Sequence, residues 1–108
     1  MPKYTQTNKI ETFTSIIHEG IYSEYFTIKE IEIYGAKRNK GSLAARQLLK
    51  NMLIKYFDKA MKYTDIEILN NKLGKPTLTI KDYLAEDISN IKFSLSHSKK
   101  EVAVFLVI

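Results

Sequence analysis

The sequence predicts a single α+β domain over residues 1–108, with an antiparallel sheet packed against one long amphipathic helix. A length of 108 residues with 44% hydrophobic content suffices for one buried core. Apolar residues recur at helical spacing in the middle of the chain, and short alternating or apolar runs typical of strands fill the second half. A strand followed by helices and then by several strands is an α+β order.

The first part of the chain predicts one strand and one short helix. The Thr- and Ile-rich segment Tyr4–Ile17 alternates roughly, as a half-buried strand does. Thr27 and Glu30 have the spacing of a capping box, which predicts a helix that ends near Tyr34. The basic stretch Lys37–Gly41 then interrupts the helical pattern.

A long helix is predicted over Ser42–Lys62. Its apolar residues recur at intervals of three and four, so they share one face and belong to the core. They are Leu49, Met52, Leu53, Tyr56, Phe57 and Ala60. Arg46 and Lys50 lie four residues apart along one flank, while Asn51 and Lys55 lie on the opposite edge.

The second half predicts four strands. They are Asp65–Leu69, Thr77–Ile80, Ile91–Ser96 and Val102–Ile108. Gly74-Lys75-Pro76 forms the turn between the first two, Lys81–Asn90 is a polar loop or short helical turn, and His97–Lys100 closes a hairpin. Because the last strand is apolar on both faces, we expect it at the centre of its sheet.

Composition excludes several classes of protein. The absence of cysteine excludes disulfide scaffolds and thiolate zinc sites, and the two histidines, His18 and His97, are too few for a multi-histidine metal site. No apolar run approaches the roughly 18 residues of a membrane helix, and no signal peptide opens the chain. We therefore expect a cytoplasmic protein that does not contact membranes.

Positive charge is concentrated in the middle of the chain. Residues 37–62 hold eight basic residues and one acidic residue, whereas the whole chain has a net charge of +5. Such a local excess is typical of a site for phosphates or for an acidic partner, although a solvated helix face has the same composition. The only two arginines, Arg38 and Arg46, are the better candidates for forked phosphate contacts.

Three short motifs have the chemistry of a ligand site, and each also has a structural interpretation. The histidine in Ser94-Leu95-Ser96-His97-Ser98 can donate to a phosphate or transfer a proton, or it can bond its own backbone in a turn. Gly74-Lys75-Pro76 allows close approach of a flat ligand such as a base, or is a plain turn. Arg46, Lys50 and Lys55 can line a polyphosphate, or form a solvated helix surface.

Taken together, these motifs give a resemblance. The order A-x-R-x3-K-x4-K, D-I-E-I-x5-G-K-P, F-S-L-S-H-S and an apolar last strand resembles the 4′-phosphopantetheinyl transferase superfamily. The likeness is greatest to its small bacterial branch, holo-acyl-carrier-protein synthase, and extends over roughly Thr27 to Ile108. The resemblance implies a phosphopantetheinyl-transferase-like single domain.

The resemblance also implies an activity. Members of this family move the phosphopantetheine arm of coenzyme A to a serine of an acyl carrier protein in fatty acid or polyketide biosynthesis. They release 3′,5′-ADP and use magnesium. Carried over by position, the coenzyme A contacts are Arg46, Lys50, Gly74, Lys75, Pro76, Ser94 and Ser96, and the catalytic residues are Lys55 and His97.

Two departures concern the metal. Asn51 occupies the position of the family's magnesium-binding glutamate, and Pro2–Ile17 contains neither the aspartate nor the glycines of the family's first strand. Since magnesium relies on carboxylates and substrate phosphates, these changes should weaken its binding. Glu11 is a candidate to replace the missing aspartate of the first strand, and its location is the only feature that supports this role. Asp65 and Glu67 alternate as a metal pair would, but they precede the Gly-Lys-Pro turn, which is not the family's metal position.

Three hypotheses follow. The first is an active phosphopantetheinyl transferase. The second is a catalytically impaired relative that binds coenzyme A, an acyl carrier protein or an intact family member. The small branch typically forms trimers with the site between subunits, so we expect a homotrimer or a mixed oligomer. The third hypothesis, a nucleic-acid-binding module, ranks last because the aromatic residues are dispersed and no binding motif is present.

Overall fold

The structure is a computed structural model that describes residues 5–10, 22–35, 40–57, 60–98 and 102–108. Within these ranges, one strand is followed by helices and then by antiparallel strands, which is the order of an α+β protein, and the predicted fold class is confirmed. The elements are β1 (Thr5–Ile10), α1 (Tyr22–Tyr25), α2 (Ile28–Tyr34), α3 (Lys40–Phe57), η2 (Tyr63–Asp65), β2 (Ile66–Asn70), β3 (Pro76–Ile80), η3 (Ala85–Ile88), β4 (Lys92–His97) and β5 (Val102–Val107).

The described strands form two antiparallel sheets. The first has the order β1-β5-β4, so the apolar strand β5 is central, as predicted. The second is the hairpin of β2 and β3, in which Asn70 pairs with Pro76 across the Gly74 turn. The sequence predicted one sheet, and the structure differs because the long helix separates the two.

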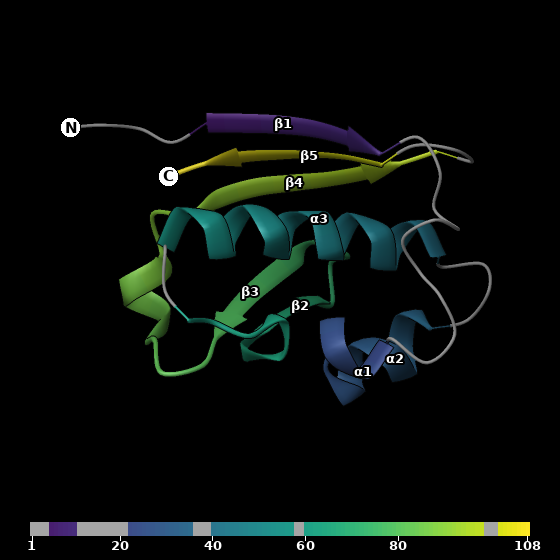
Figure 1. Cartoon of the computed structure of the whole chain (residues 1–108), viewed down its shortest axis with the longest axis horizontal. Coiled ribbons are helices and arrows are strands. Elements are labelled where there is room, and N and C mark those ends of the chain that lie inside the picture. The colour runs from purple at the N-terminus through teal and green to yellow at the C-terminus, as the bar shows by residue number, and fades with distance from the viewer. Residues whose placement is uncertain (1–4, 11–21, 36–39, 58–59, 99–101) are drawn as a thin grey trace.

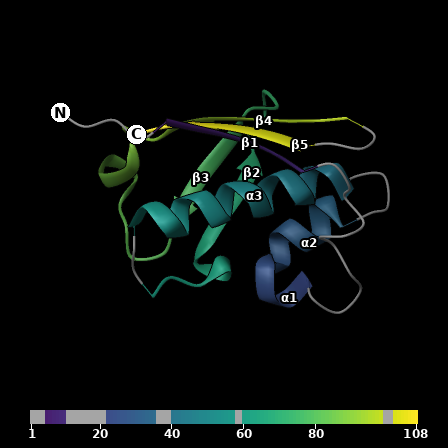
Figure 2. The same ribbon diagram turned by 45° about the horizontal axis from the view of Figure 1, so that its top comes forward.

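Helix α3 lies between two layers. Figure 1 shows the sheet β1-β5-β4 on one side of α3, and β2, β3, α1 and α2 on the other. The tilted view in Figure 2 shows the same arrangement, with the three-stranded sheet above the helix. Leu49 and Leu53 of α3 and Val104 and Leu106 of β5 have no exposed surface and belong to one apolar core. Each such side chain contributes roughly 2 kcal/mol through burial.

Helix α2 begins with the predicted capping box. The Thr27 hydroxyl accepts from the backbone N–H of Glu30, and the Glu30 carboxylate accepts from the backbone N–H of Thr27 at 2.9 Å. Gly35 follows the last residue of the helix, Tyr34, and its N–H donates to the carbonyl of Ile31. This helix therefore has the extent that the sequence predicts.

Other boundaries differ from prediction. Helix α3 begins at Lys40 and ends at Phe57, so it includes part of the basic stretch and stops short of Lys62. Asp65 ends a 3₁₀ turn, where its carboxylate accepts from the N–H of Lys62, so it does not alternate with Glu67 in a strand. Residues 11–17 of the predicted first strand lie outside the described residues.

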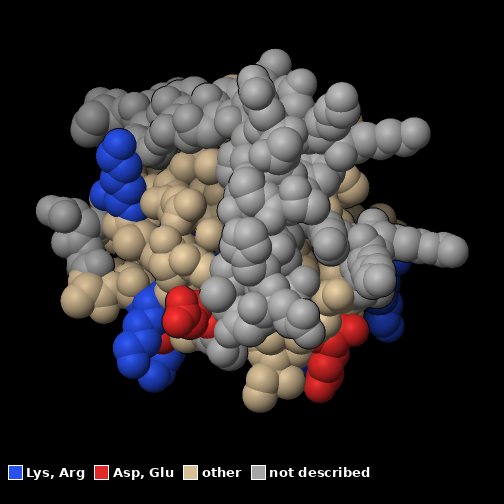
Figure 3. All heavy atoms as spheres, turned by 45° about the vertical axis from the view of Figure 1, so that its right-hand side comes forward, with Lys and Arg blue, Asp and Glu red and all other residues tan. Residues whose placement is uncertain are grey.

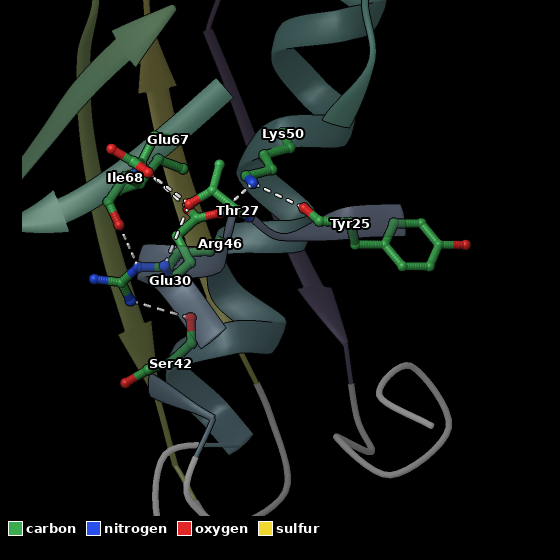
Figure 4. Close-up of polar contacts among 8 residues, drawn as sticks. All are labelled: Tyr25, Thr27, Glu30, Ser42, Arg46, Lys50, Glu67 and Ile68. Atoms are coloured by element: carbon green, nitrogen blue, oxygen red, sulfur yellow. Dashed lines mark hydrogen bonds and ion pairs between the residues drawn. The ribbon is translucent and has the colours of Figure 1, made fainter. Parts of the chain in front are cut away.

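The capping carboxylate of Glu30 also holds an ion pair that joins three elements. Lys50 of α3 donates to Glu30 Oε1 at 2.5 Å, and both side chains are fully buried. The backbone N–H of Ile68 in β2 donates to Glu30 Oε2 at 2.9 Å. Figure 4 shows the carboxylate of Glu30 between α3 and β2. The Glu30 side chain thus caps α2, neutralises Lys50 of α3 and accepts a hydrogen bond from the backbone of β2.

Among the described residues, no helix has both the length and the apolar character needed to cross a membrane.

Removing either partner of this ion pair should destabilise the fold by about 3–5 kcal/mol, because the other charge stays buried without compensation. We expect this loss for Glu30→Gln and for Lys50→Met in urea unfolding experiments. Glu32→Gln, on the exposed side of the same helix, is the matched control and should change stability by about 0.5 kcal/mol or less.

The double variant Glu30→Leu/Lys50→Met should recover only part of the loss. It removes both charges, but the N–H groups of Thr27 and Ile68 lose their acceptor. Single variants that unfold at the same urea concentration as the original protein would contradict this account.

Candidate functional site

A cavity of about 160 Å³ lies where the N-terminal part of α3, the β2–β3 turn and the end of β4 meet. It brings together Arg46 of the helix motif, Gly74 and Pro76 of the turn and His97 of the serine–histidine motif. The remaining lining residues are Ser42, Ala45, Asn70 and Leu95. Three motifs that are far apart in the sequence therefore share one small polar cavity.

Arg46 is the cation of this cavity. Its side chain is only 3% exposed, and its three hydrogen-bond acceptors among the described residues are neutral: the carbonyl of Ile68 at 2.7 Å, the carbonyl of Ser42 at 3.1 Å and Asn70 Oδ1 at 3.1 Å. Figure 4 shows the guanidinium reaching from α3 toward Ile68 and Ser42. Burial lowers the pKa of Arg46, while Tyr34 and Glu30 act in the opposite direction. An arginine remains protonated at neutral pH, so the cavity wall is positively charged.

Lys50 does not reach the cavity. Its side chain has no exposed surface, and its ammonium donates to Glu30 and to the carbonyl of Tyr25 at 2.8 Å. Burial lowers the pKa of Lys50, and the carboxylate of Glu30 opposes this shift. The structure thus gives Lys50 a role in packing, and its predicted contact with coenzyme A has no support in this geometry.

Lys55 and Asn51 are exposed and lie outside the cavity. Lys55 is nine residues beyond Arg46, or about 14 Å along the helix axis. Asn51 Oδ1 accepts from the hydroxyl of Tyr63 at 2.5 Å. Within the described residues, no three His, Asp or Glu side chains are grouped to hold a metal ion. Magnesium is usually held by one or two carboxylates together with substrate phosphates, and no carboxylate is among the described residues that line this cavity.

The side chain of Asn71 fixes the conformation of the β2–β3 turn. Asn71 Oδ1 accepts from the backbone N–H groups of Leu73 and Lys75, and Gly74 has a φ of 83°, which favours glycine. Gly74 and Pro76 face the cavity, whereas Lys75 is exposed and is not among its lining residues. The turn therefore offers backbone, rather than the lysine ammonium, to a ligand.

Strand β4 separates its serines from its histidine. Ser94 pairs with Phe105 and Ser96 with Ala103, on the face of the sheet whose residues are not buried. Leu95 and His97 alternate onto the other face and line the cavity. This alternation removes Ser94 and Ser96 from the cavity.

Sequence reasoning missed the residues that complete the site. Ser42 Oγ lies 3.5 Å from His97 Nε2, and Gly41 packs so closely on the imidazole that a Cβ there would lie 2.5 Å from Nδ1. Asn70 directly follows the predicted strand Asp65–Leu69, and its side chain accepts from Arg46. Gly41, directly before the predicted helix Ser42–Lys62, is the one signal that could have pointed to close packing there.

A larger cavity, of about 610 Å³, contains none of the predicted site residues. It is lined by Ala60, Met61, Asp65, Lys81, Asp82, Tyr83 and Asp87. Its three aspartates would repel a phosphate, and two of them, Asp65 and Asp87, accept from backbone N–H groups of nearby turns. The smaller cavity is therefore the candidate site for an anion.

The predicted basic segment does not form one continuous surface in the described part of the chain. Arg46 and Lys50 are buried, Lys55 and Lys62 are exposed, and Lys37 and Arg38 lie outside the described residues. Figure 3 shows Lys and Arg side chains at separate places around one side of the molecule, with Asp or Glu beside some of them. The buried arginine, rather than a field of lysines, distinguishes the site.

Comparison of sequences gives clear relatives. A holo-[acyl-carrier-protein] synthase from Clostridium botulinum is 32% identical over 95 residues, covering 80% of this chain and 76% of the relative. A holo-[acyl-carrier-protein] synthase from Clostridium tetani is 34% identical over 93 residues, covering 77% and 73%. No protein-family model matches the chain.

Comparison of structures supports the fold. A holo-[acyl-carrier-protein] synthase from Neisseria meningitidis superposes with a TM-score of 0.73 and 18% identity over 95% of this chain and 94% of that one. One from Bacillus anthracis, solved in complex with CoA (3′,5′-ADP), gives a TM-score of 0.70 and 21% identity over 95% and 92%. At these identities the likeness shows that the fold is shared.

Gly41→Ala should displace the His97 side chain while the protein stays folded. Alanine improves helix propensity by up to about 1 kcal/mol, but its Cβ collides with the imidazole rather than with backbone. We expect the ring proton resonances of His97 to shift in NMR spectra.

Thr79→Ala, exposed on β3 and outside the cavity, is the control and should leave the His97 resonances unchanged. Unchanged His97 resonances in Gly41→Ala would show that the imidazole does not pack against the helix.

Proposed function

This chain belongs to the holo-[acyl-carrier-protein] synthase family, and from that membership we propose that it transfers the 4′-phosphopantetheine arm of coenzyme A to a serine of an acyl carrier protein. Coenzyme A and the carrier protein are its two substrates. The alternative, an impaired relative, is not supported by the comparisons, because the relatives are synthases. The proposal treats residues 1–108 as one domain and the protein as cytoplasmic.

The observation that carries the proposal at the level of residues is the shared cavity of Arg46, the Gly74 turn and His97. In the transfer, the serine hydroxyl oxygen bonds to the phosphorus next to the pantetheine arm. The bond from that phosphorus to the bridging oxygen breaks, and 3′,5′-ADP leaves with the electron pair. The serine proton passes to a base.

In this proposal each cavity residue has one task. Arg46 holds a phosphate of coenzyme A through charge-assisted hydrogen bonds. The backbone at Gly74 and Pro76 contacts the adenine, and His97 contacts the diphosphate and accepts the serine proton. Because no carboxylate is among the described residues that line the cavity, no step is assigned to the metal.

The remaining site residues fit a site shared between protomers. Lys55, Ser94 and Ser96 are exposed but outside the cavity of their own chain. The serines lie on a sheet face where Phe105 of the central strand is 47% exposed. We propose a homotrimer in which this face packs against a neighbour and Lys55 reaches phosphates bound by another protomer. A mixed oligomer with an intact family member is the second possibility, and its mass would distinguish it.

The direct test is incubation of the protein with coenzyme A, magnesium or manganese and an apo-acyl carrier protein. We expect mass spectrometry to show one added phosphopantetheine on the carrier serine. Unmodified serine with several different carriers would contradict the proposed function.

His97→Gln should lower kcat by about 10²–10⁴-fold, with a smaller change in KM, because it removes a proton acceptor. Thr79→Ala, exposed on β3 and outside the cavity, is the control and should leave kcat/KM unchanged within about twofold. A His97 variant with unchanged kcat over the pH range would exclude this histidine as the base.

A further inference from the structure

Although the charge of Glu30 acts on Arg46 without direct contact, no carboxylate within the described residues forms an ion pair with this buried guanidinium. Its three hydrogen-bond acceptors are two backbone carbonyls and a side-chain amide. In the described part of the chain, the one ion pair joins Lys50 to Glu30. Burial of a charge without a direct ion pair is costly, so another group must help to offset the burial of this guanidinium.

That group is the ring of Tyr34. The Arg46 Cζ atom lies 3.7 Å from the centroid of the ring, and Tyr34 is itself only 7% exposed. An aromatic face attracts a cation through its quadrupole, most strongly where water is excluded. The Tyr34 ring, at the C-terminal end of α2, therefore stabilises the buried guanidinium of Arg46.

Tyr34 also fixes a second partner of the arginine. Its hydroxyl accepts from the backbone N–H of Asn70 at 2.8 Å, and Asn70 Oδ1 accepts from Arg46 Nη2 at 3.1 Å. The ring and the hydroxyl thus set the plane of the guanidinium from two directions. Tyr34 is not among the residues that line the cavity, whereas Asn70 and Arg46 are.

Ligand binding depends on whether a carboxylate or an aromatic ring stabilises the charge of Arg46. A carboxylate would neutralise Arg46 and compete with an incoming phosphate for its N–H groups. An aromatic face stabilises the cation and leaves its full charge available to an anion. We propose that Tyr34 is a positioning residue for coenzyme A, which holds Arg46 charged and oriented toward the cavity without touching the substrate. This inference rests on the proposed function, because it takes a coenzyme A phosphate as the ligand of Arg46.

Steady-state kinetics of the full chain with coenzyme A and an apo-carrier protein test the proposal. Tyr34→Leu removes the ring, and we expect it to raise KM for coenzyme A about tenfold with kcat changed by less than about twofold. Tyr34→Phe keeps the ring and should retain most of the affinity. Tyr83→Leu, a half-buried tyrosine outside this cavity, is the matched control and should leave KM unchanged.

A binding measurement separates this proposal from the proposed function. Calorimetric titration with 3′,5′-ADP should show about tenfold weaker binding to Tyr34→Leu than to Tyr34→Phe, whether or not transfer occurs. In an Arg46→Lys background, the same Tyr34→Leu change should weaken binding much less, because the planar guanidinium is gone.

The outcomes that overturn the proposal are distinct. Equal affinity of the phenylalanine and leucine variants for 3′,5′-ADP would show that the ring does not support the site. A fall in kcat with KM unchanged would place Tyr34 in the chemical step instead. Should Tyr34→Leu fail to fold, Tyr34→Phe and Tyr34→Trp provide the comparison, and both must then retain affinity within about threefold.

Discussion

Two cations of α3, four residues apart, are buried, and among the residues that the structure describes only Lys50 forms an ion pair with a carboxylate. Lys50 pairs with Glu30, whose other contacts cap α2 and pair with β2, so this lysine belongs to the fold. Arg46 receives neutral acceptors and an aromatic ring, so its charge stays available. Because a carboxylate neutralises Lys50 but not Arg46 in the described structure, Lys50 stabilises the fold and Arg46 can bind an anion.

The positions of the other site residues depend on this arrangement. The contact of Glu30 with Ile68 and that of Arg46 with the carbonyl of the same residue hold β2 against α3. The β2–β3 hairpin then carries Gly74 to one wall of the cavity, and the three-stranded sheet on the opposite side of α3 carries His97 to the other. The cavity exists because α3 contacts both sheets.

Much of this arrangement could be predicted from local patterns. The capping box of Thr27 and Glu30 and the central place of the apolar last strand follow from spacing and composition that the sequence displays. The burial of Lys50 in an ion pair could not be predicted, because its partner Glu30 is 20 residues away and already had a predicted capping role. The contacts of Tyr34 and Asn70 with Arg46 could not be predicted either, because they form only where α2, α3 and β2 meet.

The central claim is that the cavity at Arg46 binds a phosphate of coenzyme A. A crystal structure of the full chain with bound 3′,5′-ADP tests it most directly. The account predicts a phosphate oxygen within hydrogen-bond distance of the Arg46 guanidinium, with the nucleotide between the Gly74 turn and His97. A nucleotide bound elsewhere, with Arg46 still engaged only by the protein, would contradict it.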